Sequence, residues 1–213
     1  MSKQKTVRTD STAKTTKLAV TAMLAALSAV LMFFEFPLSF IAPSFYELDF
    51  SEVPVLVGTF SMGPVWGVAI EFIKILVKLI IKGTSTGGVG ELGNFLIGCS
   101  FIVPAGIIYK YKKSRTGAVV GMLTGTVAMA TLGVIINTFV LVPLYSGFMP
   151  ITEIISMGQA IFPFIDSTFT FCLYCVGPFN IIKGVIISVI VFLIYKPISK
   201  LIYSLDSMLN KKR

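Results

Sequence analysis

The chain has 213 residues, of which 55% are hydrophobic and only 13% are charged, and it contains no histidine. About half the usual share of charge excludes an ordinary soluble domain. The absence of histidine excludes a Ser-His-Asp triad and an H-E-x-x-H zinc motif. We therefore expect an all-α, polytopic membrane protein of one domain.

The net charge of +8 comes from basic residues that gather before, between and after the apolar blocks. The three clusters are Lys3, Lys5, Arg8, Lys14 and Lys17; Lys110, Lys112, Lys113 and Arg115; and Lys196, Lys200, Lys211, Lys212 and Arg213. The positive-inside rule places all three clusters in the cytoplasm. Because the charges are spread over separate breaks, we do not expect nucleic-acid binding, the other interpretation of a basic chain.

Six apolar stretches are predicted to cross the membrane. In chain order they are residues 18–34, 53–62, 65–81, 92–109, 118–142 and 179–195. We expect residues 18–205 to form a six-helix transmembrane domain, with cytoplasmic tails at 1–17 and 206–213. Six crossings return both termini to the cytoplasm, which agrees with the positions of the basic clusters.

The segment "EFPLSFIAPSFYELDFSEVP" follows the first predicted span and holds three prolines, four acids and four phenylalanines. It is too apolar for a solvated loop, so we predict that it folds back over the helix ends as an outer cap. Further along, Gly63-Pro64 predicts a tight reversal and Pro104 a kink. Residues 143–177 are predicted to form a second outer segment, in which residues 157–177 form a partial or interfacial helix.

Several chemical functions find little support in the sequence. No G-x-x-x-x-G-K-[ST] motif occurs, and the glycine-rich "KGTSTGGVGE" is interpreted as a linker. Cys172 and Cys175 form a C-x-x-C pair, but zinc would need two more Cys or His ligands, so we interpret both as packing residues and predict no metal site. Glu71 and Lys74 lie three residues apart, which favours an internal ion pair over a ligand or ion path.

Three polar side chains lie at similar depth near the outer ends of their spans: Asn137, Asn180 and Lys183. Asn180 and Lys183 project from one helix face because they are three residues apart. Single polar residues in spans often bond only to a neighbouring helix. For the set, we expect an outward-opening pocket in which a flat, weakly charged aromatic molecule satisfies all three groups.

The first span also carries small residues at four-residue spacing, Ala22 with Ala26 and Ala25 with Ala29. Such faces allow membrane helices to approach closely. The pattern leaves two possibilities open, internal packing or docking of another membrane protein.

Four stretches resemble the riboflavin-specific substrate-binding subunits of energy-coupling factor (ECF) vitamin transporters. They are "LDFSEVPVLVGTFSMGPVWGV", "NFLIGCSF", "INTFVLVPLY" and "PFNIIKGVIISVIVFLIYK". The resemblance implies a multi-pass cell-membrane protein that is not an enzyme, binds riboflavin from outside and needs no cofactor. It also implies three partner subunits, a transmembrane scaffold protein and two cytoplasmic ATPases.

The resemblance further implies roles for individual residues. Asn137, Asn180 and Lys183 would contact the flavin, and the loop at Tyr46, Glu47 and Leu48 would cover it. Ala22 and Ala26 would form the face that docks on the scaffold. Three alternatives remain open: a subunit for another vitamin, an intramembrane enzyme that uses Glu71 and Lys74, and a scaffold without a ligand.

Overall fold

Long apolar runs make the chain predominantly helical in the computed structural model, which describes residues 2–84 and 86–210. The longer helices are α1 (Ser2–Met32), α2 (Glu52–Met62), α3 (Pro64–Lys82), α4 (Val89–Tyr111), α5 (Arg115–Ile136) and α9 (Gly177–Asn210). The shorter elements are β1 (Phe36–Pro37), β2 (Glu47–Leu48), α6 (Val142–Tyr145), α7 (Ile151–Gln159), α8 (Thr168–Phe171), and the π-helical turns η1 (Asn137–Leu141) and η2 (Cys172–Val176).

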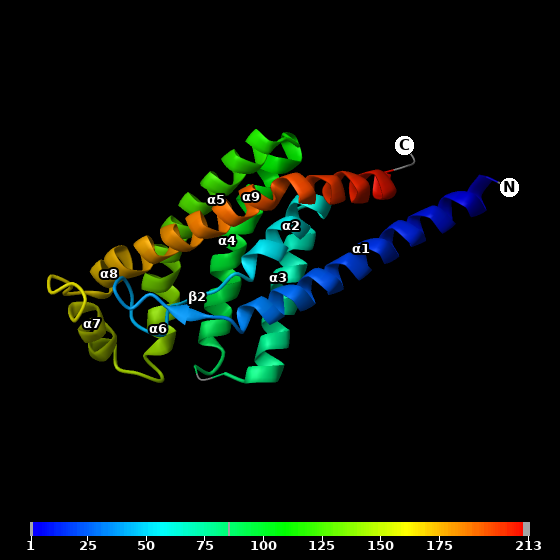
Figure 1. Cartoon of the computed structure of the whole chain (residues 1–213). Helices are drawn as coiled ribbons and strands as arrows, with labels where there is room; N and C mark the ends of the chain where they lie inside the picture. Colours follow the sequence, from blue (N-terminus) through cyan, green and yellow to red (C-terminus); the bar gives the residue numbers. More distant parts are fainter. Residues whose placement is uncertain (1, 85, 211–213) are drawn as a thin grey trace.

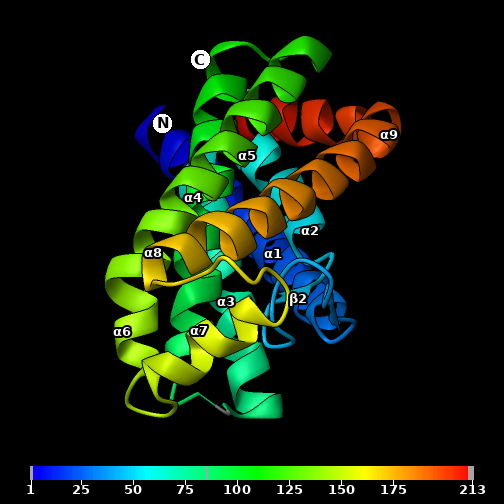
Figure 2. The same ribbon diagram turned by 90° about the vertical axis from the view of Figure 1, so that its left-hand side faces the viewer.

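The bundle is built around the short helix α2, which contacts α1, α3, α4 and α9. Helix α9 packs along α5, and α4 lies between α5 and α3 (Figure 1). Figure 2 shows α9 crossing the α4–α5 pair, with α7 and α8 at one end of the bundle. Almost every residue of α2 is buried, so this helix forms the centre of the packing.

The reversal between α2 and α3 has the predicted cause. Gly63 adopts a φ of 98°, a conformation that side chains disfavour, and its amide donates to the Thr59 carbonyl at 2.9 Å. Pro64 then begins α3, where its fixed φ suits a first helical turn and its missing amide hydrogen costs nothing.

Within the described residues, four helical stretches are long and apolar enough to cross a membrane: Lys14–Met32, Val89–Tyr111, Arg115–Tyr145 and Thr168–Lys196. Helix α2 has 11 residues and would rise only about 16 Å, short of a hydrocarbon core of about 30 Å. Helix α3 is 19 residues long but carries four charged residues, Glu71, Lys74, Lys78 and Lys82. The predicted count of six crossings therefore depends on α2 and α3.

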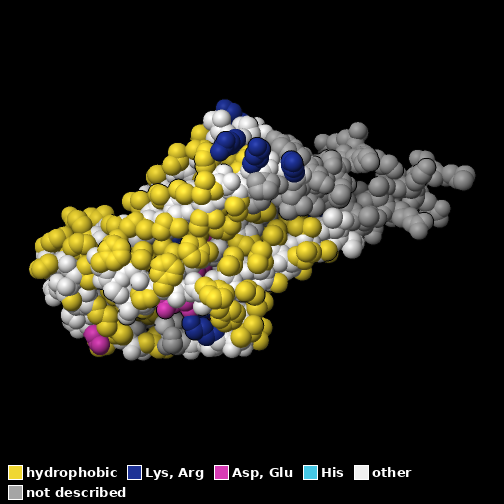
Figure 3. Space-filling view, viewed as in Figure 1, with side chains coloured by type: hydrophobic (Ala, Val, Ile, Leu, Met, Phe, Trp, Pro, Cys, Tyr) yellow, Lys and Arg dark blue, Asp and Glu magenta, His cyan; other side chains and the backbone are white. Residues whose placement is uncertain are grey.

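Apolar side chains cover the flank of the bundle, as expected for a membrane protein. Figure 3 shows this broad hydrophobic surface, with Lys and Arg side chains gathered at the end where α4 and α5 are joined. The opposite end of the same face carries acidic side chains together with a smaller basic group. The distribution agrees with two different membrane faces.

Several helices are longer than the sequence predicted. α1 begins at Ser2, inside the predicted tail 1–17, because no Gly or Pro interrupts residues 2–17. α9 continues to Asn210, and residues 211–213 of the predicted tail 206–213 lie outside the described residues. The last apolar stretch begins at Thr168 rather than at 179, so residues 168–177 of the predicted outer segment 143–177 are part of this helical run. The remainder contains α7, which lies earlier than the partial helix predicted at residues 157–177 and shares only residues 157–159 with it.

Two π-helical turns, η1 and η2, contact each other at the end of the bundle that carries α7 and α8. Each is followed by a proline two residues after its last residue: Pro143 after Leu141, and Pro178 after Val176. Proline cannot donate the backbone hydrogen bond that an α-helix requires, so the preceding turn must rearrange. Such turns are often found at functional sites.

Candidate functional site

A cavity of about 110 Å³ lies between the segment that follows α1 and the adjoining ends of α4, α5 and α9. Its walls combine polar, aromatic and aliphatic side chains from elements far apart in the sequence. They are Glu35, Phe45, Tyr46, Glu47, Asp49, Lys78, Gly90, Gly93, Asn94, Ile97, Asn137, Leu141, Tyr145, Val176, Phe179, Asn180 and Lys183. The cavity is thus of the mixed kind that suits a small organic molecule.

Five of the six predicted ligand-binding residues line this cavity: Tyr46, Glu47, Asn137, Asn180 and Lys183. The sixth, Leu48, does not line it. Its side chain is fully buried in the apolar cluster beneath the loop, because side chains alternate faces along β2. Residues 36–37 and 47–48 pair as two short antiparallel strands, which hold the intervening loop at the cavity.

Asn137 begins the π-helical turn η1 and is only 2% exposed. Its Nδ2 donates to the Gly133 carbonyl at 2.8 Å, and its Oδ1 accepts from the Tyr46 hydroxyl at 2.8 Å. The Tyr46 ring lies between Phe45, Phe171 and Phe179, with ring centroids 4.8–6.3 Å apart. The loop is therefore joined to α5 by a hydrogen bond inside an aromatic cluster.

Lys183 does not extend to the membrane surface. Its Nζ lies 2.9 Å from Asp49 Oδ2, and the two side chains are almost completely buried. Burial alone would raise the pKa of the Asp49 carboxyl, but the charges of Lys183 and Lys74 outweigh burial and hold that pKa well below its usual range. The Asp49 Oδ1 atom also accepts from the Ser51 amide at 2.7 Å, which fixes the carboxylate.

Asn180 lies one turn before Lys183 on α9 and is 4% exposed. Its Nδ2 has no hydrogen-bond partner among the residues that the structure describes. A buried donor left without a partner costs about 1–3 kcal/mol. The side chain packs close to Gly133, where a Cβ would lie 2.3 Å from that nitrogen. An acceptor supplied by a bound molecule would remove this cost.

These contacts correct one part of the sequence interpretation. The three nitrogen-bearing groups share one cavity, as expected, but a ligand is not needed to satisfy all of them. Lys183 has Asp49, and Asn137 has Gly133 and Tyr46. Asn180 alone of the three has a side-chain nitrogen without a described partner. The sequence missed Asp49 because it is separated from Lys183 by 134 residues.

A second buried ionic cluster lies next to the first. Lys74 Nζ lies 2.6 Å from Glu52 Oε1 and 2.8 Å from Glu71 Oε2, and it donates to Ser51 Oγ at 2.9 Å. The predicted internal ion pair of Glu71 and Lys74 is confirmed, and Glu52 is an additional partner. None of Glu52, Glu71 and Lys74 lines the cavity. Their mutual pairing favours a structural role over the alternative of an intramembrane catalytic pair.

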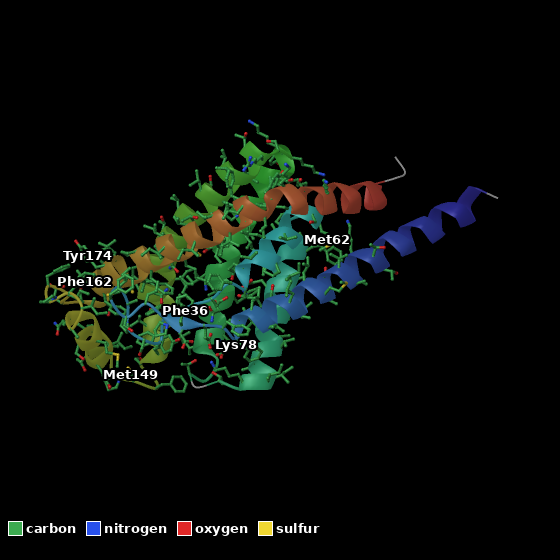
Figure 4. The ribbon with its side chains drawn as sticks, in the orientation of Figure 1. Phe36, Met62, Lys78, Met149, Phe162 and Tyr174 are labelled. Atoms are coloured by element: carbon green, nitrogen blue, oxygen red, sulfur yellow. The ribbon has the colours of Figure 1, made fainter. Side chains whose placement is uncertain are left out.

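Charged groups also surround the mouth of the cavity. Lys78 and Lys82 both donate to the Glu35 carboxylate, and Figure 4 shows Lys78 on α3 near Phe36, far from Met62. Burial favours the neutral form of Glu35, but these two hydrogen bonds outweigh it and lower its pKa. Burial and the nearby Glu35 raise the pKa of Glu47. The mouth thus holds the ionised carboxylate of Glu35 beside the carboxylate of Glu47, which takes up a proton more readily.

Two further observations concern residues singled out in the sequence. Cys172 and Cys175 are free and buried in the core, which confirms that they are packing residues. On α1, Ala25 and Ala29 are buried whereas Ala22 and Ala26 are exposed. The two small-residue pairs therefore lie on different faces: one packs internally, and the other remains accessible at the surface of the bundle.

The fold and the cavity together define a helical membrane protein with a buried, polar and aromatic binding pocket. Comparison with known proteins identifies the class more closely. Residues 16–195 match the family described as "ECF transporter, substrate-specific component". The chain belongs to this family, whose members are transport components rather than enzymes.

Individual relatives agree with this assignment. The chain is 35% identical to the riboflavin transporter RibU of Staphylococcus aureus, with 84% of this chain and 88% of the relative covered. It is also 35% identical to the riboflavin transporter FmnP of Bacillus subtilis, with 85% and 91% covered. A solved S component of a bacterial ECF transporter superposes with a TM-score of 0.70 at 34% identity, covering 88% of this chain and 98% of the other.

Proposed function

We propose that this protein is the riboflavin-binding subunit of an ECF-type vitamin uptake transporter. Two lines of observation support the proposal: its relatives in two organisms are named riboflavin transporters, and the cavity has the chemistry that a flavin requires. An isoalloxazine ring is flat, with carbonyl oxygens and ring nitrogens along one edge. The aromatic and aliphatic walls suit its faces, and the polar side chains suit that edge.

The observation that carries the proposal is the unpartnered Nδ2 of Asn180 in a cavity that Lys183 also lines. The two side chains present one neutral and one charged donor from the same helix face. A flavin carbonyl would accept from Asn180, and the Lys183 ammonium would favour an oxygen with partial negative charge. Asp49 keeps that ammonium in place and partly neutralised, which suits an uncharged ligand better than an anionic one.

The same proposal includes the arrangement in the membrane and the partners. Six crossings, with α2 and α3 among them, would place both termini in the cytoplasm and the cavity toward the outside. The loop at Tyr46 and Glu47 would cover the bound vitamin. Ala22 and Ala26 would dock on a transmembrane scaffold protein that is joined to two cytoplasmic ATPases, which supply the energy for release.

The direct test is the absorption spectrum of protein purified in detergent from a host that contains riboflavin. We expect a yellow sample with a flavin spectrum that persists through gel filtration. Competition then distinguishes riboflavin from other vitamins: excess thiamine, biotin or folate should leave the flavin bound. Release of flavin by one of these vitamins, or a colourless protein that fails to bind added riboflavin, would contradict the proposal.

A further inference from the structure

A second cavity, of about 350 Å³, lies between α1, the turn from α2 to α3, and the last turn of α4. It is separate from the riboflavin cavity, because the two share no lining residue. Its lining residues are Lys17, Thr59, Phe60, Ser61, Met62, Gly63, Pro64, Val65, Trp66, Gly106, Tyr109, Lys110 and Lys113. Three lysines line it, and none of these described lining residues is acidic.

The lysines come from two parts of the chain that are far apart in the sequence. Lys17 projects from α1, with its Nζ 5.9 Å from the centre of the Trp66 ring. Lys110 lies in the last turn of α4, Lys113 follows the end of that helix, and both are exposed. Tyr109 is fixed beside them by a 3.0 Å hydrogen bond with the Tyr195 hydroxyl. Positive charge is thus concentrated over a hollow whose other lining residues are uncharged.

The cavity also adjoins exposed apolar surface. Val65, one of its lining residues, is 79% exposed, and Leu18 next to Lys17 is 60% exposed. Trp and Tyr are the residues that favour the boundary between headgroups and hydrocarbon. Basic pockets between transmembrane helices at such a boundary bind anionic lipid headgroups.

We propose that this cavity binds the phosphate of an anionic phospholipid, with the lysines around the headgroup and the acyl chains along α1 and Val65. A membrane lipid fits the site better than an acidic protein segment, because the basic hollow continues directly into exposed apolar surface. Lysines at the end of α4 also complement the partial negative charge of that helix end. Exposed lysines outside the cavity also attract anionic lipid, so binding inside the cavity must be distinguished from this general attraction.

Lys112 supplies the matched control. It is the residue that caps α4, between Lys110 and Lys113 in the chain, and it is exposed but does not line the cavity. K110Q and K112Q remove the same charge from neighbouring positions. If the cavity binds the headgroup, K110Q and the triple variant K17Q/K110Q/K113Q lose lipid preference, whereas K112Q keeps it.

Trp66 provides a local readout, because it is the only tryptophan in the chain and lines the cavity. Ligand-free protein is reconstituted in lipid mixtures that contain phosphatidylglycerol or phosphatidylcholine with brominated acyl chains, and Trp66 quenching gives the relative affinity. We expect preference for phosphatidylglycerol, lowered about fivefold by K110Q and further by the triple variant. Added inorganic phosphate or glycerol phosphate should not displace the lipid.

Three results would overturn this proposal. Equal losses in K110Q and K112Q would show general surface charge. Displacement of the brominated lipid by millimolar glycerol phosphate would show a site for a soluble phosphate compound. Unchanged lipid preference in the triple variant, together with lost co-purification of a transmembrane partner, would show a protein contact. Riboflavin binding is expected to stay within about twofold of wild type in all variants, because the two cavities are separate.

Discussion

Lys183 on α9 and Asp49 in the loop before α2 form a buried ion pair, with Nζ and Oδ2 2.9 Å apart. Burying two charges is costly, and the attraction between them compensates only when the geometry is good and further hydrogen bonds are made. Here the Ser51 amide supplies such a bond to Asp49. The pair therefore holds the Lys183 ammonium at the cavity wall. Without Asp49, a lysine at this depth would extend its ammonium toward the membrane surface.

Asp49→Asn should weaken riboflavin binding, because it leaves the Lys183 ammonium buried without its counter-charge. Loss of one partner of a buried pair costs about 3–5 kcal/mol, so the variant should also unfold at a lower temperature. The measurement is a riboflavin fluorescence-quenching titration combined with a thermal unfolding curve. Glu153→Gln, at an exposed acid on α7, is the control and should change neither value.

The double variant Asp49→Asn with Lys183→Met keeps this prediction testable if the single variant fails to fold. Removing both charges should restore much of the thermal stability. Affinity should remain low, because the charged donor is gone. Full recovery of riboflavin affinity in the double variant would show that the pair serves only the fold.

Asn180→Ala should raise the Kd for riboflavin by roughly three- to tenfold, the equivalent of one hydrogen bond of about 0.5–1.5 kcal/mol. Because its Nδ2 has no described partner, its removal should not lower the unfolding temperature through a lost hydrogen bond. Ser188→Ala, further along α9 and outside the cavity, is the control. A large loss of stability with unchanged affinity would assign Asn180 a packing role instead.

Gly133→Ala tests the position of Asn180 without altering the amide itself. The added Cβ would lie 2.3 Å from Nδ2, so the side chain of Asn180 must shift. We expect weaker riboflavin binding, of the same order as for Asn180→Ala, and little additional loss when the two changes are combined. Gly147→Ala places its Cβ at an ordinary 3.5 Å from the Leu144 carbonyl and should leave the titration unchanged.

Ala26→Trp should stop riboflavin uptake in cells while the purified protein binds riboflavin normally. Ala26 is exposed on α1, on the same face as Ala22, and a large side chain would prevent close approach of another helix. Val120 on α5 is 46% exposed, so Val120→Trp is the control for a bulky side chain at an exposed apolar position. Equal loss of uptake in both variants would point to a general effect of the substitution.

The sequence predicted the cavity more completely than it predicted the contacts inside it. Hydropathy and depth placed Asn137, Asn180 and Lys183 together, because each was predicted near the outer end of its span. The contacts between distant side chains were harder to predict. Asp49 and Asn94 lie in two of the stretches that resemble the family, yet nothing in their local pattern indicates which distant side chain each one faces. The two π-helical turns were not predicted, although Pro143 and Pro178, at equal spacing after them, are local signals that could have located them.

Charge also limited what hydropathy could show about the helices. Lys74 and Glu71 lower the apolar character of α3, and only the packed structure shows that Lys74 pairs with both Glu71 and Glu52. Residues 168–177 were assigned to the outer segment 143–177 because a proline such as Pro178 suits the first turn of a helix, which placed the start of the last span after them. The π-helical turn before Pro178 lets the helix continue instead.

The account depends most on a flavin occupying the cavity beside Asn180 and Lys183, and a titration of ligand-free protein with riboflavin tests this directly. We expect saturable quenching of flavin fluorescence at one riboflavin per chain, with clearly weaker binding in both Asn180→Ala and Lys183→Ala. Wild-type quenching reproduced by both variants, with the same Kd and unchanged folding, would show that riboflavin binds elsewhere.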